Sequence, residues 1–430
     1  MKERKLESKF NFAVLTNRYT KLSKISDETL KKYLLQLTKT VEGTITQSLP
    51  EYFGIILDGW SEGSTHYVAI FACYSEDSTA KYPLLAIAPL FDETDYGAES
   101  HKAFIGDVLE LFGKSLQNLS FIVADNAAVN RSLSDLLNVP FVGCASHRFN
   151  LAVNRYLETY EPVIEKVHQL MTKLRTIKQA GKLRRKTNLQ PVIRNKTRWS
   201  STFEMVKRFF TLEDFIDMDD VQLSELFPSR SDLIRLKTVL FLLLFNIKAL
   251  KDLEQFESVT KILQKVDITL AEVREVFDAI LLEFPTMSRH LASDGAIVHS
   301  PQFESAVVKC LNGTVPLTEE DTTLLEKFAS REEIPIQADG EQLSIAEKAL
   351  QARKRRKLEH RQAARFQDLS FIQPTSNIVE RLFSKARLIL TDYRKSMSPY
   401  TFECLIFLGN NRDLWDMSTV ANVIKELKDQ

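Results

Sequence analysis

Five short apolar runs between residues 52 and 145 constrain the fold of this chain more than any other feature. Their sequences are YFGIILDGW (52–60), HYVAIFACY (66–74), YPLLAIAPL (82–90), LSFIVAD (119–125) and VPFVGCA (139–145). Continuous apolar runs of this length, bounded by polar or turn residues, are typical of buried β-strands. Because the first three runs follow one another closely, we expect them to form an antiparallel meander.

Helical patterns separate the later runs. Residues 100–112 have helical spacing with Ser100 as a candidate N-cap, and further helices are expected from Asn126 to about Leu137 and from about His147. The order β-β-β-α-β-α-β-α is that of an RNase H-like domain, in which three antiparallel strands precede parallel strands joined by helical crossovers. The sequence therefore predicts an α/β fold, an RNase H-like mixed sheet flanked by helices.

A mostly α-helical insertion domain is expected to interrupt this fold, because strand signals nearly vanish from about 160 to 365. The run VLFLLLF (239–245) is far shorter than the ~20 residues that span a bilayer, so we interpret it as a buried helix. The expected parts are an N-terminal helical segment (1–50), the first part of the core (51–160), the helical insertion (161–365) with a flexible linker near 312–343, and the final core helix with C-terminal helices (366–430).

The composition excludes several classes of protein. Gly and Pro, 13 each in 430 residues, are too few for a turn-rich all-β protein, a collagen-like chain or a long disordered chain. The 4 cysteines lie far apart without a CxxC pair, which argues against a disulfide framework or a zinc finger and fits a reducing compartment. The start, MKERKLESKFNF, lacks the apolar stretch of a secretory signal, so we expect a soluble intracellular protein with no membrane partner.

Charge is sorted along the chain although the formal net charge is zero. Residues 166–208 carry thirteen Lys or Arg and a single acid, Glu204, whereas residues 213–232 carry seven acids and one base. A second basic block, RKRRK, opens the segment 353–365. This sorting suggests that one surface meets a polyanion while another stays solvated or repels it. Solvated helix faces are the alternative, and the second block also resembles a nuclear-import signal.

Acidic residues end two of the predicted strands, Asp58 in ILDGW and Asp125 in IVADN. In open α/β sheets the strand ends point into the functional crevice, and two carboxylates that share divalent ions would suit in-line phosphoryl transfer. Each aspartate could instead cap the turn or helix that follows it. Glu380, in PTSNIVERLFSKARLIL, lies at the edge of an apolar helix stripe. Its position alone indicates a surface acid favoured by the helix dipole.

Several segments together resemble the hAT superfamily of DNA transposases. They are FGIILDGWSEGSTHYVAI, FIVADNAAVN, GCASHRFNLAVN, KTRWSSTFEMVKRF, and PTSNIVERLFSKARLILTDYRKSMSP with FLGNNRDLW. These segments cover about residues 50–210 and 365–416 in the order of the family, and the last resembles its C-terminal dimerisation region. We therefore expect DNA as a partner, a homodimer or higher homo-oligomer, and a nuclear location.

The resemblance implies that Asp58, Asp125 and Glu380 form a D-D-E triad that binds Mg²⁺ or Mn²⁺. It thereby reverses the interpretation of Glu380 as a surface acid. Water and then a 3′-hydroxyl would be the nucleophiles of strand cleavage and joining, with no covalent enzyme intermediate. The spacing is 67 residues (125 − 58) and then 255 residues (380 − 125), and the second interval encloses the helical insertion.

Further DNA-binding residues are expected beside the triad and in the basic stretch. Cys144 and His147 by themselves make a poor metal site, and a satisfied histidine at a helix start or a phosphate contact is the simpler interpretation. The pair matches the family's Cys-x-x-His pattern, which implies a contribution to DNA contacts or cleavage near the active site. Arg198 and Trp199 match its Arg-Trp segment, in which the Trp stabilises a flipped base, but Trp199 could equally be a core residue. The other candidates for backbone contacts are Lys196, Lys182, Arg184, Arg185 and Lys186.

One family feature has no match in this sequence, because we find no paired Cys and His ligands of an N-terminal BED-type zinc finger. The sequence therefore supports two hypotheses. The first is an active hAT-type transposase, favoured by the three acids. The second is a domesticated, catalytically inactive protein that binds DNA and dimerises, favoured by the missing finger.

Overall fold

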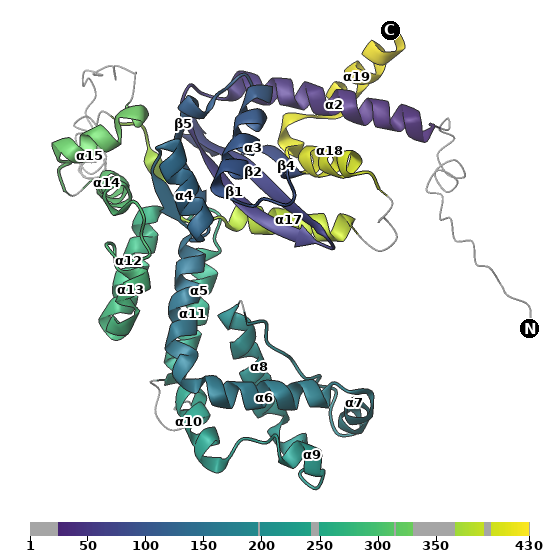
Figure 1. Cartoon of the computed structure of the whole chain (residues 1–430), viewed down its shortest axis with the longest axis vertical. Helices are drawn as coiled ribbons and strands as arrows, with labels where there is room; N and C mark the ends of the chain where they lie inside the picture. The colour runs from purple at the N-terminus through teal and green to yellow at the C-terminus, as the bar shows by residue number, and fades with distance from the viewer. Residues whose placement is uncertain are drawn as a thin grey trace, which may run out of the picture.

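The computed structural model describes residues 25–196, 198–241, 249–313, 315–329, 366–390 and 397–429 (Figure 1). Within these ranges a mixed sheet of six strands is flanked by helices, and a helical region adjoins it. This arrangement confirms the predicted fold class. The basic segment 353–365, residues 1–24 and residues 242–245 of the long apolar run lie outside the described residues.

The six strands are β1 (Phe53–Glu62), β2 (Thr65–Glu76), β3 (Thr79–Lys81), β4 (Leu84–Pro89), β5 (Leu119–Ala124) and β6 (Phe141–Gly143). Their order is β3-β2-β1-β5-β6, with β4 also paired to β2. Strand β2 is antiparallel to β1, β3 and β4, whereas β5 is parallel to β1 and β6 is parallel to β5. All five apolar runs therefore form strands, and the first three form the antiparallel part, as predicted.

Strand β3 was not predicted. It pairs with the end of β2 through a tight turn at Asp77 and Ser78, whose φ angles are 49° and 60°. Positive φ at both central residues is the geometry of a two-residue hairpin turn that matches the twist of the flanking strands. The short polar sequence gave no apolar signal for a strand here.

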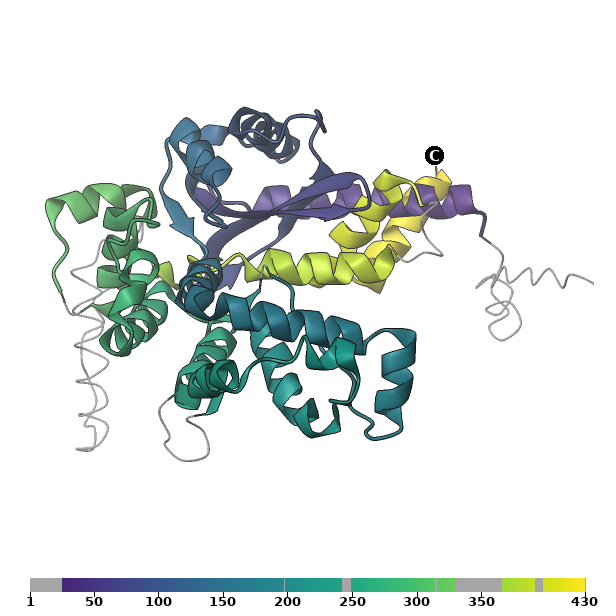
Figure 2. The same cartoon turned by 60° about the horizontal axis from the view of Figure 1, so that its bottom comes forward.

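Helices from distant parts of the chain cover the sheet. Those around it are α2 (Asp27–Ser48), α3 (Ala98–Leu111), α4 (Ala128–Leu137), α14 (Pro301–Asn312), α15 (Glu319–Leu324), α17 (Asn377–Ile389), α18 (Pro399–Asn410) and α19 (Met417–Asp429). Helix α17 packs along β1 and β2, and α18 packs along β4. In Figure 2, α3 and α4 lie on one side of the sheet and α17 on the other. Because both faces are covered, every residue of β5 is buried.

The prediction that Ser100 caps its helix is wrong. Helix α3 begins one turn earlier, with Gly97 as its N-cap. Asp95 accepts hydrogen bonds from the backbone N–H of Gly97 (2.8 Å) and from the Ser100 hydroxyl (2.6 Å). The turn before the helix is therefore organised by an aspartate, and Ser100 lies inside the first turn.

Part of the predicted linker at 312–343 is helical. The Thr318 hydroxyl and Asp321 cap the start of α15 reciprocally, which is a capping box. Leu325 and Phe328, which follow this helix, are buried in the same core as the sheet, where the Phe328 ring lies 6.0 Å from that of Phe121. Two apolar anchors within an otherwise polar stretch are enough to hold residues 318–328 against the sheet.

The helical region has its own core. Its helices are α5 (Ala145–Leu157), α6 (Glu161–Leu174), α7 (Ile177–Arg184), α8 (Trp199–Leu212), α9 (Val221–Ser224), α10 (Arg230–Phe241), α11 (Ala249–Leu263), α12 (Leu270–Glu283) and α13 (Ser288–Leu291). Helix α5 leaves the sheet after β6 and contributes Phe149 and Val153 to this second core. No described helix is both long and apolar enough to cross a bilayer.

The C-terminal helices pack into the sheet core. Phe402 and Phe407 of α18 are buried there, whereas Leu388 near the end of α17 is 75% exposed. Asn411 completes the edge of the sheet, because its side-chain oxygen accepts from the Leu84 N–H and its amide donates to the Leu84 carbonyl, both at 2.9 Å. Most apolar residues of this region are therefore core residues.

Candidate active site

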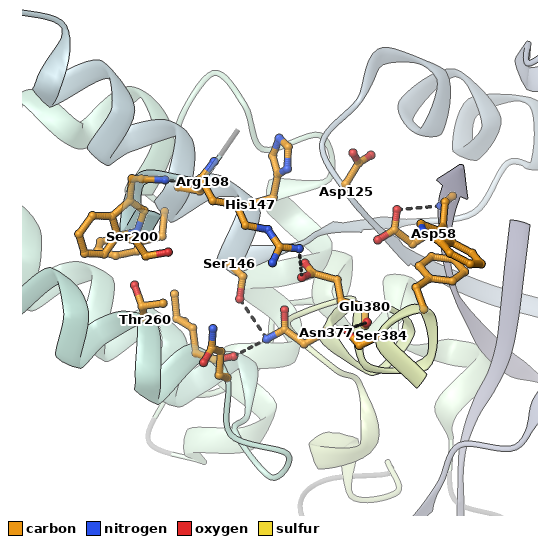
Figure 3. Close-up of a pocket in the computed structure, with 18 of the residues that line it drawn as sticks. Asp58, Asp125, Ser146, His147, Arg198, Ser200, Thr260, Asn377, Glu380 and Ser384 are labelled. Carbon is orange, nitrogen blue, oxygen red and sulfur yellow. Dashed lines mark hydrogen bonds and ion pairs between the residues drawn. The ribbon is translucent and has the colours of Figure 1, made fainter. Parts of the chain in front are cut away.

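A cavity of about 590 Å³ lies where the sheet meets the helical region. The acids Asp58, Asp125 and Glu380 line it and come from three separate elements, namely β1, the residue after β5, and the first turn of α17 (Figure 3). Segments 255 residues apart in the sequence (380 − 125) thus contribute to one site. The structure brings together all three acids of the predicted triad.

Asp58 lies at the rim of the parallel part of the sheet. Strand β1 pairs with β5 only as far as Ile56 but continues to Glu62 in its hairpin with β2. The predicted strand end is therefore an end of the parallel pairing and not of the strand itself. The backbone N–H of Gly59 donates to the Asp58 carboxylate at 2.8 Å.

The environment of Asp58 disfavours its negative charge. Its pKa is raised from 3.8 to about 7, mainly by burial and also by the carboxylates of Asp125 and Glu380, while the Gly59 hydrogen bond and Arg198 oppose the shift. Desolvation and like charges both favour the protonated form of a carboxyl group. Because perturbed carboxyls of this kind cluster at functional sites, the shift supports this cavity as the site.

Asp125 faces the cavity and also organises the helix that follows it. Its Oδ1 accepts from the Asn130 side-chain amide at 2.6 Å and from the Ala127 N–H at 3.1 Å. The capping interpretation is therefore correct in part, since one carboxylate oxygen binds the start of α4. A residue that caps a helix can line a site at the same time because its carboxylate has two oxygens.

The start of α17, which carries Glu380, is bound to the helical region. The Asn377 amide donates to the Ser146 hydroxyl (3.1 Å) and to the Leu263 carbonyl (2.8 Å). The Ser376 N–H contacts the Cys144 sulfur at 3.4 Å, and the Ala145 N–H donates to the Pro374 carbonyl at 2.9 Å (Figure 3 shows the Asn377 bonds). These bonds hold α5, α11 and α17 together around the cavity.

Cys144 and His147 have different positions in this arrangement. Cys144 is only 1% exposed, and burial raises the pKa of its thiol, so it remains an uncharged packing group beneath Ser376. His147 lies one turn further along α5 and lines the cavity. Of the predicted pair, only the histidine faces the space that a ligand would occupy.

Arg198 and Trp199 stand at the start of α8, opposite α17. The exposed Arg198 guanidinium donates to the Glu380 carboxylate at 3.2 Å. Trp199 lines the cavity but is only 2% exposed, and its ring contacts those of Phe149, Phe203 and Phe256. In this conformation the tryptophan is a core residue, and its stacking on a base stays a prediction.

The other predicted DNA-binding residues lie away from the cavity. Lys182 pairs with Asp217 (3.4 Å) and Asp220 (3.1 Å), and Lys196 pairs with Glu165 (3.5 Å). Arg184, Arg185 and Lys186, at the end of α7 and just beyond it, are exposed.

The expected separation of basic and acidic surfaces is wrong for part of these stretches. Lys166 pairs with Asp232 at 3.1 Å, and Lys182 pairs with acids of the same acidic stretch. Two lysines of the basic stretch, on α6 and α7, are thus paired with acids of the acidic stretch.

The donor chemistry of the cavity fits a divalent cation, whereas the arrangement of the third acid fits less well. Carboxylate oxygens are the ligands that Mg²⁺ and Mn²⁺ prefer, and a cation would relieve the repulsion that raises the pKa of Asp58. Across the described residues, however, no group of three or more His, Cys, Asp and Glu is placed to hold a metal. Glu380 contacts Arg198 instead. Asp58 and Asp125 are therefore the better candidates for ligands.

Sequence reasoning missed several residues of the site. Asn130 and Asn377 position two of the acids, and both lie within the segments DNAAVN and TSNIVERLF that carry the family resemblance. Arg387 also lines the cavity. The spacing of Glu380, Ser384 and Arg387 at i, i+4 and i+7 could have indicated that they share one helix face.

A comparison with protein families gives one match. Residues 142–239, from β6 to α10, match the family described as the ZBED1 RNase-like helical domain, a family derived from hAT transposases. No curated protein matches the chain. The family match covers the part of the helical region from α5 to α10 and supports a relationship to hAT transposases.

Proposed function

We propose that the chain is a hAT-transposase-derived protein that binds DNA and cleaves and joins DNA strands in a metal-dependent reaction. The observation that carries this proposal is the convergence of Asp58, Asp125 and Glu380 on one cavity beside a helical region of RNase-like type. The proposal includes Mg²⁺ or Mn²⁺ as cofactor, a homodimer or higher homo-oligomer formed through the C-terminal region, and a nuclear location in which DNA transposition and recombination take place.

Asp58 and Asp125 would hold the metal, and Glu380 would join them once it has left Arg198. A divalent ion bound there would supply Lewis-acid stabilisation of the phosphodiester and a lowered pKa for the attacking hydroxyl of water or of a DNA 3′ end. Asp58 must lose its proton to serve as a ligand, and its pKa of about 7 makes this loss possible at neutral pH. Asn130 keeps Asp125 in place through their 2.6 Å hydrogen bond.

Glu380 needs a change of partner to act in this way. Its ion pair with Arg198 is exposed, with 68% of the arginine side chain and 45% of the glutamate side chain accessible. An exposed pair of this kind is worth about 0–1 kcal/mol, so a cation or a DNA phosphate can displace it. Arg198 would then contact the DNA backbone, while His147 faces the same space.

Nicking of a supercoiled plasmid tests the catalytic proposal. We expect the purified chain to nick DNA with Mg²⁺ or Mn²⁺ and not in EDTA. Asp125→Asn should reduce the rate at least a thousandfold while DNA binding persists, because a neutral amide is a poor ligand for a hard cation. Asp107→Asn is the matched control, since Asp107 is exposed on α3 and does not line the cavity. Equal nicking by wild type and Asp125→Asn would overturn the assignment.

The second candidate is a catalytically inactive protein that binds DNA and dimerises. Two observations favour it. Glu380 is paired with Arg198 and so is engaged with a cation of the protein, and Trp199 is buried and so is not exposed to a DNA base. DNA binding without metal-dependent nicking under any of the conditions above would support it. Nicking that depends on Asp125 would exclude it.

A further inference from the structure

One end of the cavity carries an arginine, Arg387, that is not part of the proposed triad. Arg387 lies on α17, and together with Glu380 and Ser384 it lines the cavity from a single helix face. At a rise of 1.5 Å per residue, Arg387 is about 10 Å along the helix axis from Glu380. It is thus close enough to belong to the same site and too far away to contact the same phosphate.

The contacts of Arg387 leave it available for an anion. Its Nε lies 3.8 Å from the Glu62 carboxylate at the end of β1, and 68% of its side chain is exposed. An ion pair of this length and exposure contributes little, so an incoming phosphate can replace the carboxylate. An arginine can bind the two oxygens of a phosphate simultaneously because its donors form a planar fork.

The cavity wall next to Arg387 is apolar. The rings of Trp60 and Phe383 stack with their centroids 5.5 Å apart, and both side chains line the cavity. Ser384, between Glu380 and Arg387, is small, and its hydroxyl donates to the Glu380 carbonyl. This end therefore combines a cation with an apolar wall, as the phosphate and the sugar of a nucleotide require.

Charge explains why a second cation is needed. The carboxylates of Asp58, Asp125 and Glu380 repel phosphates, and among the described residues that line the cavity Arg198 is the cation that opposes them at that end. A DNA strand must therefore be held by cations on both sides of the acids. Arg198 reaches from α8 on one side, and Arg387 lies on α17 on the other.

We propose that Arg387 binds a DNA backbone phosphate a short way along the strand from the reacting one, so that the strand follows α17 from Glu380 to Arg387. The separation of about 10 Å along the helix axis places the two residues on different phosphates. This inference rests on the proposed DNA-binding function, names a contact residue that lies outside the triad, and does not require catalysis.

Fluorescence anisotropy with a short duplex of arbitrary sequence tests this contact. The variants are made in the full chain carrying Asp125→Asn, in EDTA, over a series of KCl concentrations. Arg387→Ala should weaken binding roughly tenfold at low salt and reduce the slope of log K against log[salt] by about 1. Arg387→Lys should retain the slope because the charge remains.

Lys385→Ala is the matched control. Lys385 is exposed on the same helix, carries the same charge and does not line the cavity, so we expect less than about a twofold change in affinity. Equal effects of Arg387→Ala and Lys385→Ala would overturn the contact, since only the general field of the protein would then act. Thermal unfolding of each variant confirms that it is folded.

The outcomes also separate this inference from the catalytic proposal. A selective loss with Arg387→Ala supports the contact even where the wild-type chain fails to nick plasmid DNA. Metal-dependent nicking by the wild type, combined with equal effects of Arg387→Ala and Lys385→Ala, leaves the catalytic proposal standing and overturns the contact alone.

Discussion

The sheet region and the helical region differ in how their charged side chains are arranged. Around the sheet, Asp58, Asp125 and Glu380 are gathered in one cavity, and their proximity contributes to raising the pKa of Asp58 to about 7. In the helical region, by contrast, the pairs Lys166–Asp232 and Lys182–Asp220 match opposite charges, both at 3.1 Å. The sheet region thus gathers carboxylates in one cavity, whereas these two lysines of the helical region are paired with acids.

This difference indicates where function lies. A matched ion pair carries no net charge, so it attracts a charged ligand less strongly than a group of carboxylates does. Carboxylates gathered in a cavity are stabilised by a cation that enters, because the cation offsets their mutual repulsion. The basic stretch of the sequence therefore marks the ligand site less reliably than the two acids at the strand ends.

The largest expected effect on stability comes from the buried ion pair between the two regions. Arg148 of α5 is 3% exposed and donates to Glu304 of α14 at 3.0 Å and to the carbonyls of His290 and Ala292. Arg148→Ala should lower the free energy of unfolding by about 3–5 kcal/mol, because it leaves a buried carboxylate uncompensated.

Urea denaturation measures this effect, and Arg155→Ala is its control. Arg155 also lies on α5, but its ion pair with Glu158 is exposed, so the loss should stay below about 0.5 kcal/mol. Similar losses for the two variants would contradict the view that the boundary between the regions depends on a buried charge pair.

The next effect is the pH dependence of Asp58. Its folded pKa of about 7 lies above its ordinary value of 3.8, so the folded state binds this proton more tightly than the unfolded state. The free energy of unfolding should therefore fall as pH rises from about 4 to about 7 and stay low above that range. Asp58→Asn should be neutral at pH 4 and should stabilise the protein by about 1–3 kcal/mol at pH 8.

Asp220→Asn is the matched substitution in the helical region and should act with the opposite sign. Hydrogen bonds from Gln179 and Lys182 lower the pKa of Asp220, so its contribution is present above the ordinary value and is lost as pH falls through the folded pKa. Thermal unfolding at pH 4 and pH 8 compares the two variants. A stabilising Asp220→Asn, or an Asp58→Asn without pH dependence, would break the contrast between the regions.

The smallest effect on stability is expected at Lys182, because its ion pairs are on the surface. Lys182→Ala should barely lower the thermal stability and barely change the salt dependence of DNA binding. Replacing the exposed Arg184, Arg185 and Lys186 together should reduce the slope of that dependence by as much as about 3. Anisotropy titrations measure both. Equal slopes for the two variants would contradict the expected difference between the paired Lys182 and the exposed residues 184–186.

Much of the fold could be predicted from local sequence. A short apolar run bounded by polar or turn residues, such as FIVA in β5, is typical of a strand covered on both faces, and it can be recognised without knowledge of its distant partners. The helix N-cap at Gly97 and the strand β3 were harder to predict. They depend on turns at Asp95 and at Asp77 and Ser78, which a hydrophobic pattern does not indicate.

The candidate site could be predicted only in part. Asp58 and Asp125 stand at the ends of recognisable strands, so the residues themselves indicated them. Glu380 was indicated by a family resemblance, since nothing local distinguishes it from other acids in the first turn of a helix. Arg387 was missed because it belongs to a site only through a cavity whose other walls are formed by β1, α5 and α8.

The sequence by itself determined the five apolar strands, the main helices and the α/β class, because these follow from short-range patterns of apolar and polar residues. Only the tertiary structure decided which charges meet. Arg198 and Glu380 are 182 positions apart yet form an ion pair, Lys182 meets an acidic segment, and Trp199 is enclosed by Phe149 and Phe256. Electrostatic energies and burial depend on distances through space, and those distances exist only once the two cores have packed together.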